Sequence, residues 1–197
     1  LSPADVAPLK PTADQNPSPA TTKKIQQILD PYCLALVHIS AEARVKTHPG
    51  PATPTLIQGG WQTYLIKVHN EAATNAQLAW ESSNADPALH QSTGQPRPRE
   101  ENLITPGQLA NRFLEISFYQ RSPMTTQLSG LNLEYTILQI YTSTTGKREA
   151  SLGFHIGQGT QDLAARNAIP ILFQSRASTK VIFDIKDFDG KPAMASF

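Results

Sequence analysis

Histidine is the residue of this sequence best suited to hold a metal ion. The chain has five of them: His38, His48, His69, His90 and His155. A zinc site on one helix or strand needs histidines a few residues apart, but the separations are 10, 21, 21 and 65 residues, and no His-Glu-x-x-His segment occurs. We therefore predict no metal site, and only one assembled from distant strands stays open. We interpret His69, beside Asn70 and Glu71, as solvated or as capping a turn.

Three aspartates near the end of the chain are the nearest approach to a calcium loop. Asp184, Asp187 and Asp189 precede Gly190. The loop of calcium-binding helix pairs requires a carboxylate or amide at position 185, where Ile stands, and Glu at position 196, where Ser stands. We interpret the segment as a strand end followed by an Asp-Gly turn. A calcium site of another geometry is the alternative.

The segment 157–162 is a polar loop that could contact a sugar. Its glycines resemble half of a dinucleotide-binding fingerprint, but Asp162 stands where that pattern has glycine, and the lysine of a phosphate loop is missing. The polar side chains Gln158, Thr160, Gln161 and Asp162 could instead form hydrogen bonds with a polar ligand.

Two tryptophans offer a second way to bind a carbohydrate. Trp61 and Trp80 lie in segments that we predict to be paired strands. Facing outward, they would form a platform on which a sugar stacks, and facing inward, they would belong to the core. Large aromatic side chains commonly dominate sandwich cores, which favours the inward orientation.

Groups able to act as nucleophiles or as general acids are poorly placed. No Gly-x-Ser-x-Gly segment occurs. Cys33 lies in an apolar run, which is typical of a buried, unreactive thiol. The paired carboxylates Glu100 and Glu101 lie on a proline-rich loop, which is too weakly anchored to separate their pKa values. We predict no catalytic residue, no metal ligand and no cofactor, and interpret these 197 residues as not an enzyme by themselves.

The elements that must position these residues are mostly short strands. In 61–69, Tyr64, Ile66 and Val68 share one face and polar residues share much of the other, so this is a strand, with 75–81 as its hairpin partner. The segment 131–142 is apolar on both faces and predicts a central strand. Further strands are predicted at 33–39, 43–47, 112–119, 148–156, 169–174 and 179–186. The pattern predicts an all-β fold, an immunoglobulin-like β-sandwich.

The chain divides into three parts. Residues 1–30 are predicted to be a proline-rich extended arm (1–20) followed by a short helix (21–29), because the arm holds five prolines. Residues 31–186 form the sandwich, with a long polar loop at 82–108 in which one or two helical turns follow Thr105. Residues 187–197 begin a further hairpin or a truncated domain, so we expect the natural product to continue.

Composition excludes two classes of partner. The net charge is +1 and no basic stripe is present, which argues against nucleic-acid binding. No apolar run approaches the roughly 18 residues of a membrane span. Charged residues make up 17% of the chain against a usual value of about 25%, so we expect a surface that binds through uncharged polar groups.

Several segments within residues 25–197 carry a family resemblance. They are Glu42–Lys46, Leu56–Trp61, Ile66–Ala72, Leu128–Tyr135, Gly146–Ala150, Gly157–Leu163 and Asp187–Pro192. Together they resemble the β-rich N-terminal region of secreted planctomycete proteins, in which a CehA/McbA-like metallohydrolase domain of the PHP (polymerase and histidinol phosphatase) type often follows. The resemblance implies an extracytoplasmic location, secreted, periplasmic or at the cell surface, and a hydrolase domain downstream. That domain's clustered metal ligands have no counterpart here, so no catalytic residue is carried over.

The sequence thus favours a non-catalytic accessory or assembly module. Its partner would be another protein or a second copy, bound through the N-terminal arm. Two alternatives remain: the N-terminal part of a metal-dependent hydrolase whose catalytic domain lies downstream, and a carbohydrate-binding module whose ligand is a glycan.

Overall fold

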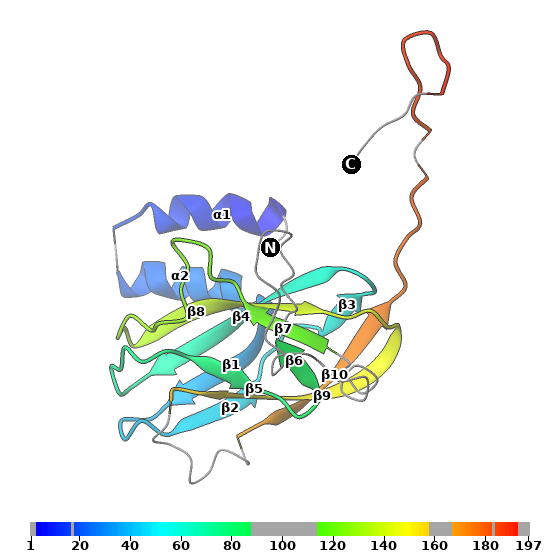
Figure 1. Cartoon of the computed structure of the whole chain (residues 1–197). Helices are drawn as coiled ribbons and strands as arrows, with labels where there is room; N and C mark the ends of the chain where they lie inside the picture. The colour runs from blue at the N-terminus through cyan, green and yellow to red at the C-terminus, as the bar shows by residue number, and fades with distance from the viewer. Residues whose placement is uncertain (1–2, 17, 88–113, 158–166, 183, 193–197) are drawn as a thin grey trace.

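A computed structural model describes residues 3–16, 18–87, 114–157, 167–182 and 184–192 of the chain (Figure 1). The helices are α1 (Pro3–Ala13), α2 (Pro19–Leu29) and the short 3-10 helix η1 (Asp30–Tyr32). The strands are β1 (Cys33–Ile39), β2 (Val45–Pro49), β3 (Thr55–Ile57), β4 (Trp61–Asn70), β5 (Ala79–Glu81), β6 (Ala85–Pro87), β7 (Leu114–Phe118), β8 (Leu133–Tyr141), β9 (Gly146–His155) and β10 (Ile169–Arg176).

These strands form two sheets, which confirms the predicted all-β sandwich with short helices. One sheet has six strands in the order β2-β1-β4-β8-β7-β6, and the other has four in the order β3-β10-β9-β5. Most pairs are antiparallel, but β1 and β4, β6 and β7, and β10 and β3 are parallel. The predicted central strand is β8, which lies between β4 and β7.

The core fills the space between the two sheets. Along β4, Tyr64, Ile66 and Val68 are buried, whereas the residues between them are partly exposed. The alternation arises because successive strand residues point to opposite faces, so every second residue enters the core. Phe118 of the six-stranded sheet and Phe154 of the four-stranded sheet meet across the core, with ring centroids 6.3 Å apart.

The opposite face of the six-stranded sheet, here called the outer face, is partly covered by the helices (Figure 1). The Lys67 ammonium on this face contacts both carboxylate oxygens of Asp30 at 2.8 and 2.9 Å and Gln26 of α2 at 3.1 Å. Asp30 also accepts the hydroxyl hydrogen of Tyr135 in the neighbouring strand β8, at 2.8 Å. This network fastens the end of α2 to β4 and β8.

The sequence predicted an extended N-terminal arm, but Pro3–Ala13 form helix α1. The proline ring fixes φ at a value that a helix also adopts, so this φ angle is compatible with a helix. Pro8 and Pro11 each remove a backbone hydrogen bond within it, and Thr12 donates its hydroxyl to the Pro8 carbonyl at 2.7 Å. α1 lies along α2, and this packing stabilises a helix that intrinsic preference disfavours (Figure 1).

Helix α2 confirms the helix predicted at 21–29, but it begins two residues earlier. Ser18 is the N-cap, and its Oγ accepts the backbone N–H of Thr21 at 3.1 Å. Pro19 follows at the first helical position, where a missing N–H costs nothing.

Two predictions for the segment 75–108 need correction. Ala79–Glu81 (β5) pairs with β9 in the other sheet and is not the hairpin partner of β4. Asn70 turns the chain away from β4, because its side chain bonds both the N–H and the carbonyl of Thr74. The predicted loop 82–108 begins with a strand, β6, which pairs with β7; its part 88–108, with the helical turns after Thr105, lies outside the described residues.

The predicted strand 179–186 is not formed: residues 179–182, 184 and 185 have no strand pairing, and Lys186 makes only an isolated antiparallel bridge with Pro192. Residues 177–182 and 184–192, here called the C-terminal segment, leave β10 and reach away from the sandwich (Figure 1). The predicted Asp-Gly turn is formed: Gly190 donates its N–H to the Asp187 carbonyl, and Asp187 donates to the Lys191 carbonyl.

Candidate functional site

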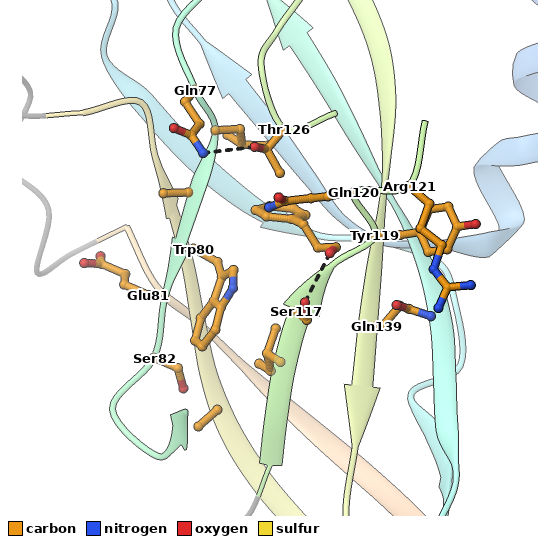
Figure 2. A pocket seen from close by; sticks show the side chains of 15 residues that line it. Gln77, Trp80, Glu81, Ser82, Ser117, Tyr119, Gln120, Arg121, Thr126 and Gln139 are labelled. Atoms are coloured by element: carbon orange, nitrogen blue, oxygen red, sulfur yellow. Dashed lines mark hydrogen bonds between the residues drawn. The ribbon is translucent and has the colours of Figure 1, made fainter. Parts of the chain in front are cut away.

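A pocket of about 850 Å³ lies where strands β5 and β7 of the two sheets diverge (Figure 2). Trp80 projects into it from β5, and Ser117 faces it from β7. Its floor consists of core residues, among them Leu78, Ile116 and Phe118. The remaining walls are polar and include Gln77, Tyr119, Gln120, Arg121 and Gln139.

A pocket lined by an aromatic ring and by amide, hydroxyl and guanidinium groups can bind a ligand with a flat apolar face and many hydroxyls. Gln77 is held in place by a 3.1 Å hydrogen bond from its amide nitrogen to Thr126 Oγ1 (Figure 2). Such a pocket combines stacking with directed hydrogen bonds, which is the usual composition of a small-molecule site.

The two tryptophans do not form a joint platform. Trp61 lies on β4 in the six-stranded sheet and is 43% exposed, whereas Trp80 lies on β5 in the four-stranded sheet and packs partly against the core. Trp61 contacts Tyr141, with ring centroids 5.5 Å apart. Sequence reasoning placed both residues on paired strands because it paired β5 with the wrong neighbour.

The aspartates of the alternative calcium site, Asp184, Asp187 and Asp189, do not gather at one point. Asp184 pairs with Lys186 at 2.9 Å and Asp189 pairs with Lys191 at 3.1 Å, while Asp187 accepts the Phe188 N–H at 2.7 Å. Hydrogen bonds from the Lys191 backbone and side chain hold the pKa of Asp189 below its ordinary value. These carboxylates stabilise the turn at 187–191. Gln158, Thr160, Gln161 and Asp162 lie outside the described residues.

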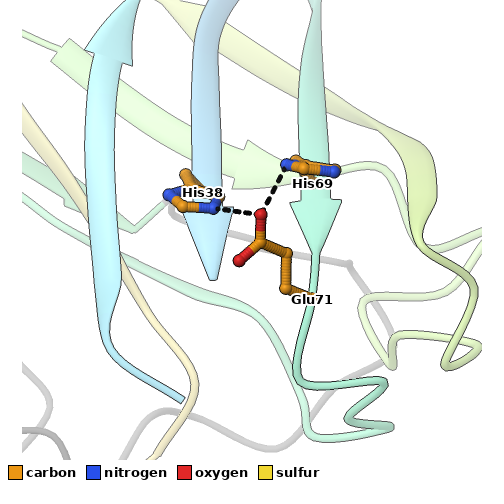
Figure 3. A group of neighbouring side chains, drawn as sticks. All are labelled: His38, His69 and Glu71. Atoms are coloured by element: carbon orange, nitrogen blue, oxygen red, sulfur yellow. Dashed lines mark ion pairs between the residues drawn. The ribbon is translucent and has the colours of Figure 1, made fainter. Parts of the chain in front are cut away.

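A second cluster on the outer face joins two of the scattered histidines (Figure 3). His38 Nε2 lies 3.1 Å from Glu71 Oε1, and His69 Nδ1 lies 3.7 Å from the same oxygen. The imidazole rings are stacked, with centroids 5.3 Å apart and planes inclined by 19°. The structure thus brings together side chains from distant strands, which is the arrangement that the sequence left open.

The strand pairing explains this cluster. β1 and β4 are parallel neighbours, and their register sets His38 directly beside His69. Glu71 follows in the turn after β4, and its carboxylate lies between the two imidazoles (Figure 3). The alternation of His69 and Glu71 is visible in the sequence, but the pairing of β1 with β4 is not, because 21 residues separate the two strands.

Cys33 is buried beside Asp30 and Lys67, as its apolar surroundings predict. Burial raises the pKa of its thiol to about 11, and the negative charge of Asp30 acts in the same direction. The thiol is therefore protonated at neutral pH and is not a nucleophile. Burial raises the pKa of the Tyr135 hydroxyl too, and so do its hydrogen bond to Asp30 and the negative charge of that carboxylate.

Comparison with known proteins adds little. No protein-family model and no curated protein matches the chain. Among solved structures, domains 4 and 5 of the S-layer protein SbsC match 67% of this chain at 9% sequence identity, with a TM-score of 0.28. The match covers 51% of the SbsC chain, about half of its length. The described helices include none with the length and apolar character that a membrane crossing requires.

Proposed function

We propose that this chain is a non-catalytic, extracytoplasmic assembly module that joins copies of itself through its C-terminal segment. The observation that carries the proposal is the exposure of three large apolar side chains there. Val181, Ile182 and Phe188 are 64%, 80% and 99% exposed. Neighbouring apolar groups left in water on one segment are typical of a surface that a protein partner covers.

The backbone of this segment favours one mode of association. Residues 177–182 continue from strand β10 in an extended conformation without strand pairing, so their backbone groups are free to complete a sheet. An extended segment gains affinity by adding as a strand to the edge of a sheet, with its side chains setting the specificity.

A second copy of the chain offers such edges. Strands β2 and β6 end the six-stranded sheet, and β3 and β5 end the four-stranded sheet. Edge strands carry unpaired backbone groups that accept an added strand. We place the contact at the C-terminal segment and not at the predicted N-terminal arm, because α1 packs on α2 of its own chain.

Sedimentation velocity of the full chain over a range of concentrations tests this proposal. We expect the sedimentation coefficient to rise with concentration in the wild type, and to stay at the monomer value when Val181, Ile182 and Phe188 are all changed to Ser. The matched control is Leu131→Ser, which removes an equally exposed apolar side chain (64%) outside this segment and should behave as the wild type. A wild type that stays monomeric at every concentration would contradict the proposal.

The location and the larger context belong to the same proposal. The resemblance to secreted planctomycete proteins supports an extracytoplasmic module placed before a PHP-type hydrolase domain. Intact mass of the natural product tests this context, which requires a chain longer than 197 residues. Hydrolysis of esters or phosphoesters by the purified chain with added divalent metal would contradict the non-catalytic part.

The pocket between β5 and β7, here called the Trp80 pocket, supports a second candidate function, the binding of a saccharide. Binding to a glycan array should be lost in Gln139→Ala and Arg121→Ala, which change the polar wall, as well as in Trp80→Ala. Trp61→Ala, which removes a tryptophan outside the pocket, should bind as the wild type does. Equal binding by all four variants would place the sugar elsewhere and reject the pocket.

A further inference from the structure

The cluster of His38, His69 and Glu71 stands apart from both the C-terminal segment and the Trp80 pocket. The side chains are 33%, 39% and 43% exposed, so an ion from solution can reach them. We propose that these three residues bind one divalent metal ion of the zinc class. The proposal is independent of the proposed function, since it uses none of the same residues.

The distances between the candidate ligand atoms fit such an ion. Two are 3.1 and 3.7 Å, and all three ligand atoms lie within 4.8 Å of one another. Zinc binds imidazole nitrogen and carboxylate oxygen at about 2.0–2.2 Å in a tetrahedron, so its ligands lie ~3.3 Å apart. Small side-chain rotations would bring the three atoms to that separation.

The backbone holds the three positions together without the ion. His38 and His69 are register partners on adjacent strands, and the Glu71 N–H donates to the Ile39 carbonyl at the end of β1, at 2.9 Å. His38 and His69 lie on paired strands, which fix a site better than loops do, and Glu71 follows in the turn that this hydrogen bond holds against β1.

The chemistry of the three groups also calls for a shared cation. Glu71 Oε1 accepts hydrogen bonds only, and each neutral imidazole has one nitrogen lone pair. One ion between them would accept an electron pair from each of the three atoms. Two imidazoles and one carboxylate are ligands typical of zinc and of other divalent first-row metals. Three protein ligands leave a fourth position of the tetrahedron to solvent.

Two lysines on the outer face bear on the affinity. Lys67 lies two residues before His69, but Asp30 already neutralises its ammonium group at 2.8 Å. Lys46 on β2 is the register partner of His38. Among the described ion pairs, none joins Lys46 to a carboxylate. Its positive charge should weaken metal binding, so Lys46→Ala should bind the ion more tightly than the wild type.

Isothermal titration of the full chain with zinc chloride tests the site. We expect one ion per chain in the wild type and a loss of affinity of about tenfold or more in His38→Ala, His69→Ala and Glu71→Gln. The matched control is His48→Ala, which removes a histidine of β2 that is paired with Leu36 and lies outside the cluster. Melting temperatures in EDTA should agree among all variants, because these side chains are only half-buried.

Cobalt(II) provides a second readout that does not depend on stability. The visible absorption of tetrahedral cobalt should appear with the wild type and His48→Ala and be missing with His69→Ala. Absence of binding by the wild type at millimolar zinc would overturn the proposal. Equal binding by the wild type and all three cluster variants would overturn it too, since the ion would then lie elsewhere.

Discussion

At the scale of single residues, Asp30 links the end of helix α2 to two strands of the six-stranded sheet. Its carboxylate accepts hydrogen bonds from Lys67 and Tyr135, and it stands where α2 ends and η1 begins. The Lys67 side chain is only 19% exposed, so its ammonium has lost much of its hydration and depends on this partner.

Replacing Asp30 by Ala should therefore destabilise the protein. We expect the free energy of unfolding to fall by about 1–3 kcal/mol, because a partly buried ammonium and a hydroxyl both lose their acceptor. Urea unfolding measures the change. The matched control is Asp184→Ala, whose ion pair with Lys186 is exposed and should contribute less than about 0.5 kcal/mol. Equal effects of the two substitutions would contradict this interpretation.

Cys33 and Tyr64 should make the protein less stable as the pH becomes alkaline. Burial raises the pKa of the Cys33 thiol from 9.0 to about 11 and that of the Tyr64 hydroxyl from 10.0 to about 12. Each group prefers its neutral form in the folded state. Its contribution is therefore complete below the unfolded pKa and is lost as the pH rises towards the folded pKa.

We expect the free energy of unfolding to decline from about pH 9 upwards in the wild type. In Cys33→Ala the decline should begin closer to pH 10, where Tyr64 begins to ionise in the unfolded chain. Urea titrations at a series of pH values give both curves. Parallel curves for the two proteins between pH 9 and 10 would exclude Cys33 as the source.

The sequence alone could predict the environment of some residues and not the contacts of others. Cys33 was correctly predicted as buried, since its neighbours in the chain are apolar. The meeting of His38 and His69 depends on which strands pair, and pairing between distant strands leaves no local signal. For the same reason, the polar walls of the Trp80 pocket could not be foreseen.

At the scale of elements, the two helices show how local preference and packing compete. α2 has a proline at its first position and a serine cap, so its sequence agrees with its structure. α1 has prolines in its interior, which disfavour a helix, and it packs along α2. The proline content of residues 1–20 predicts an extended segment, and composition carries no information on the packing against α2.

Loss of the cap of α2 should be measurable. Ser18→Ala removes the acceptor for the Thr21 N–H and should lower the free energy of unfolding by about 1 kcal/mol. Ser18→Asp keeps an acceptor and should stay within about 0.5 kcal/mol of the wild type. Urea unfolding distinguishes them. If aspartate were as destabilising as alanine, the cap would not be the cause.

At the scale of the whole molecule, two phenylalanines mark the difference between folding and association. Phe154 is completely buried between the sheets, and Phe188 is 99% exposed on the C-terminal segment. Phe154→Ala should lower the free energy of unfolding by about 3–5 kcal/mol, because it leaves a cavity in the core. Phe188→Ala should leave the stability of the dilute monomer unchanged within about 0.5 kcal/mol.

Chemical denaturation at low protein concentration measures both effects. A large loss of monomer stability in Phe188→Ala would mean that the side chain folds onto its own sandwich, and the assembly proposal would then lose its main support. The sandwich itself could be predicted from the alternation of apolar residues along the strands. The lack of strand pairing at 179–182 could not, because the same alternation is present there.

Hydrogen–deuterium exchange of the backbone amides of residues 177–182 and 184–186 tests the assembly proposal most directly. If the C-terminal segment adds as a strand to another copy, these amides are protected at high protein concentration and exchange freely on dilution. The variant with Val181, Ile182 and Phe188 changed to Ser should exchange freely at every concentration. Rapid exchange of the wild-type segment at all concentrations would contradict the account.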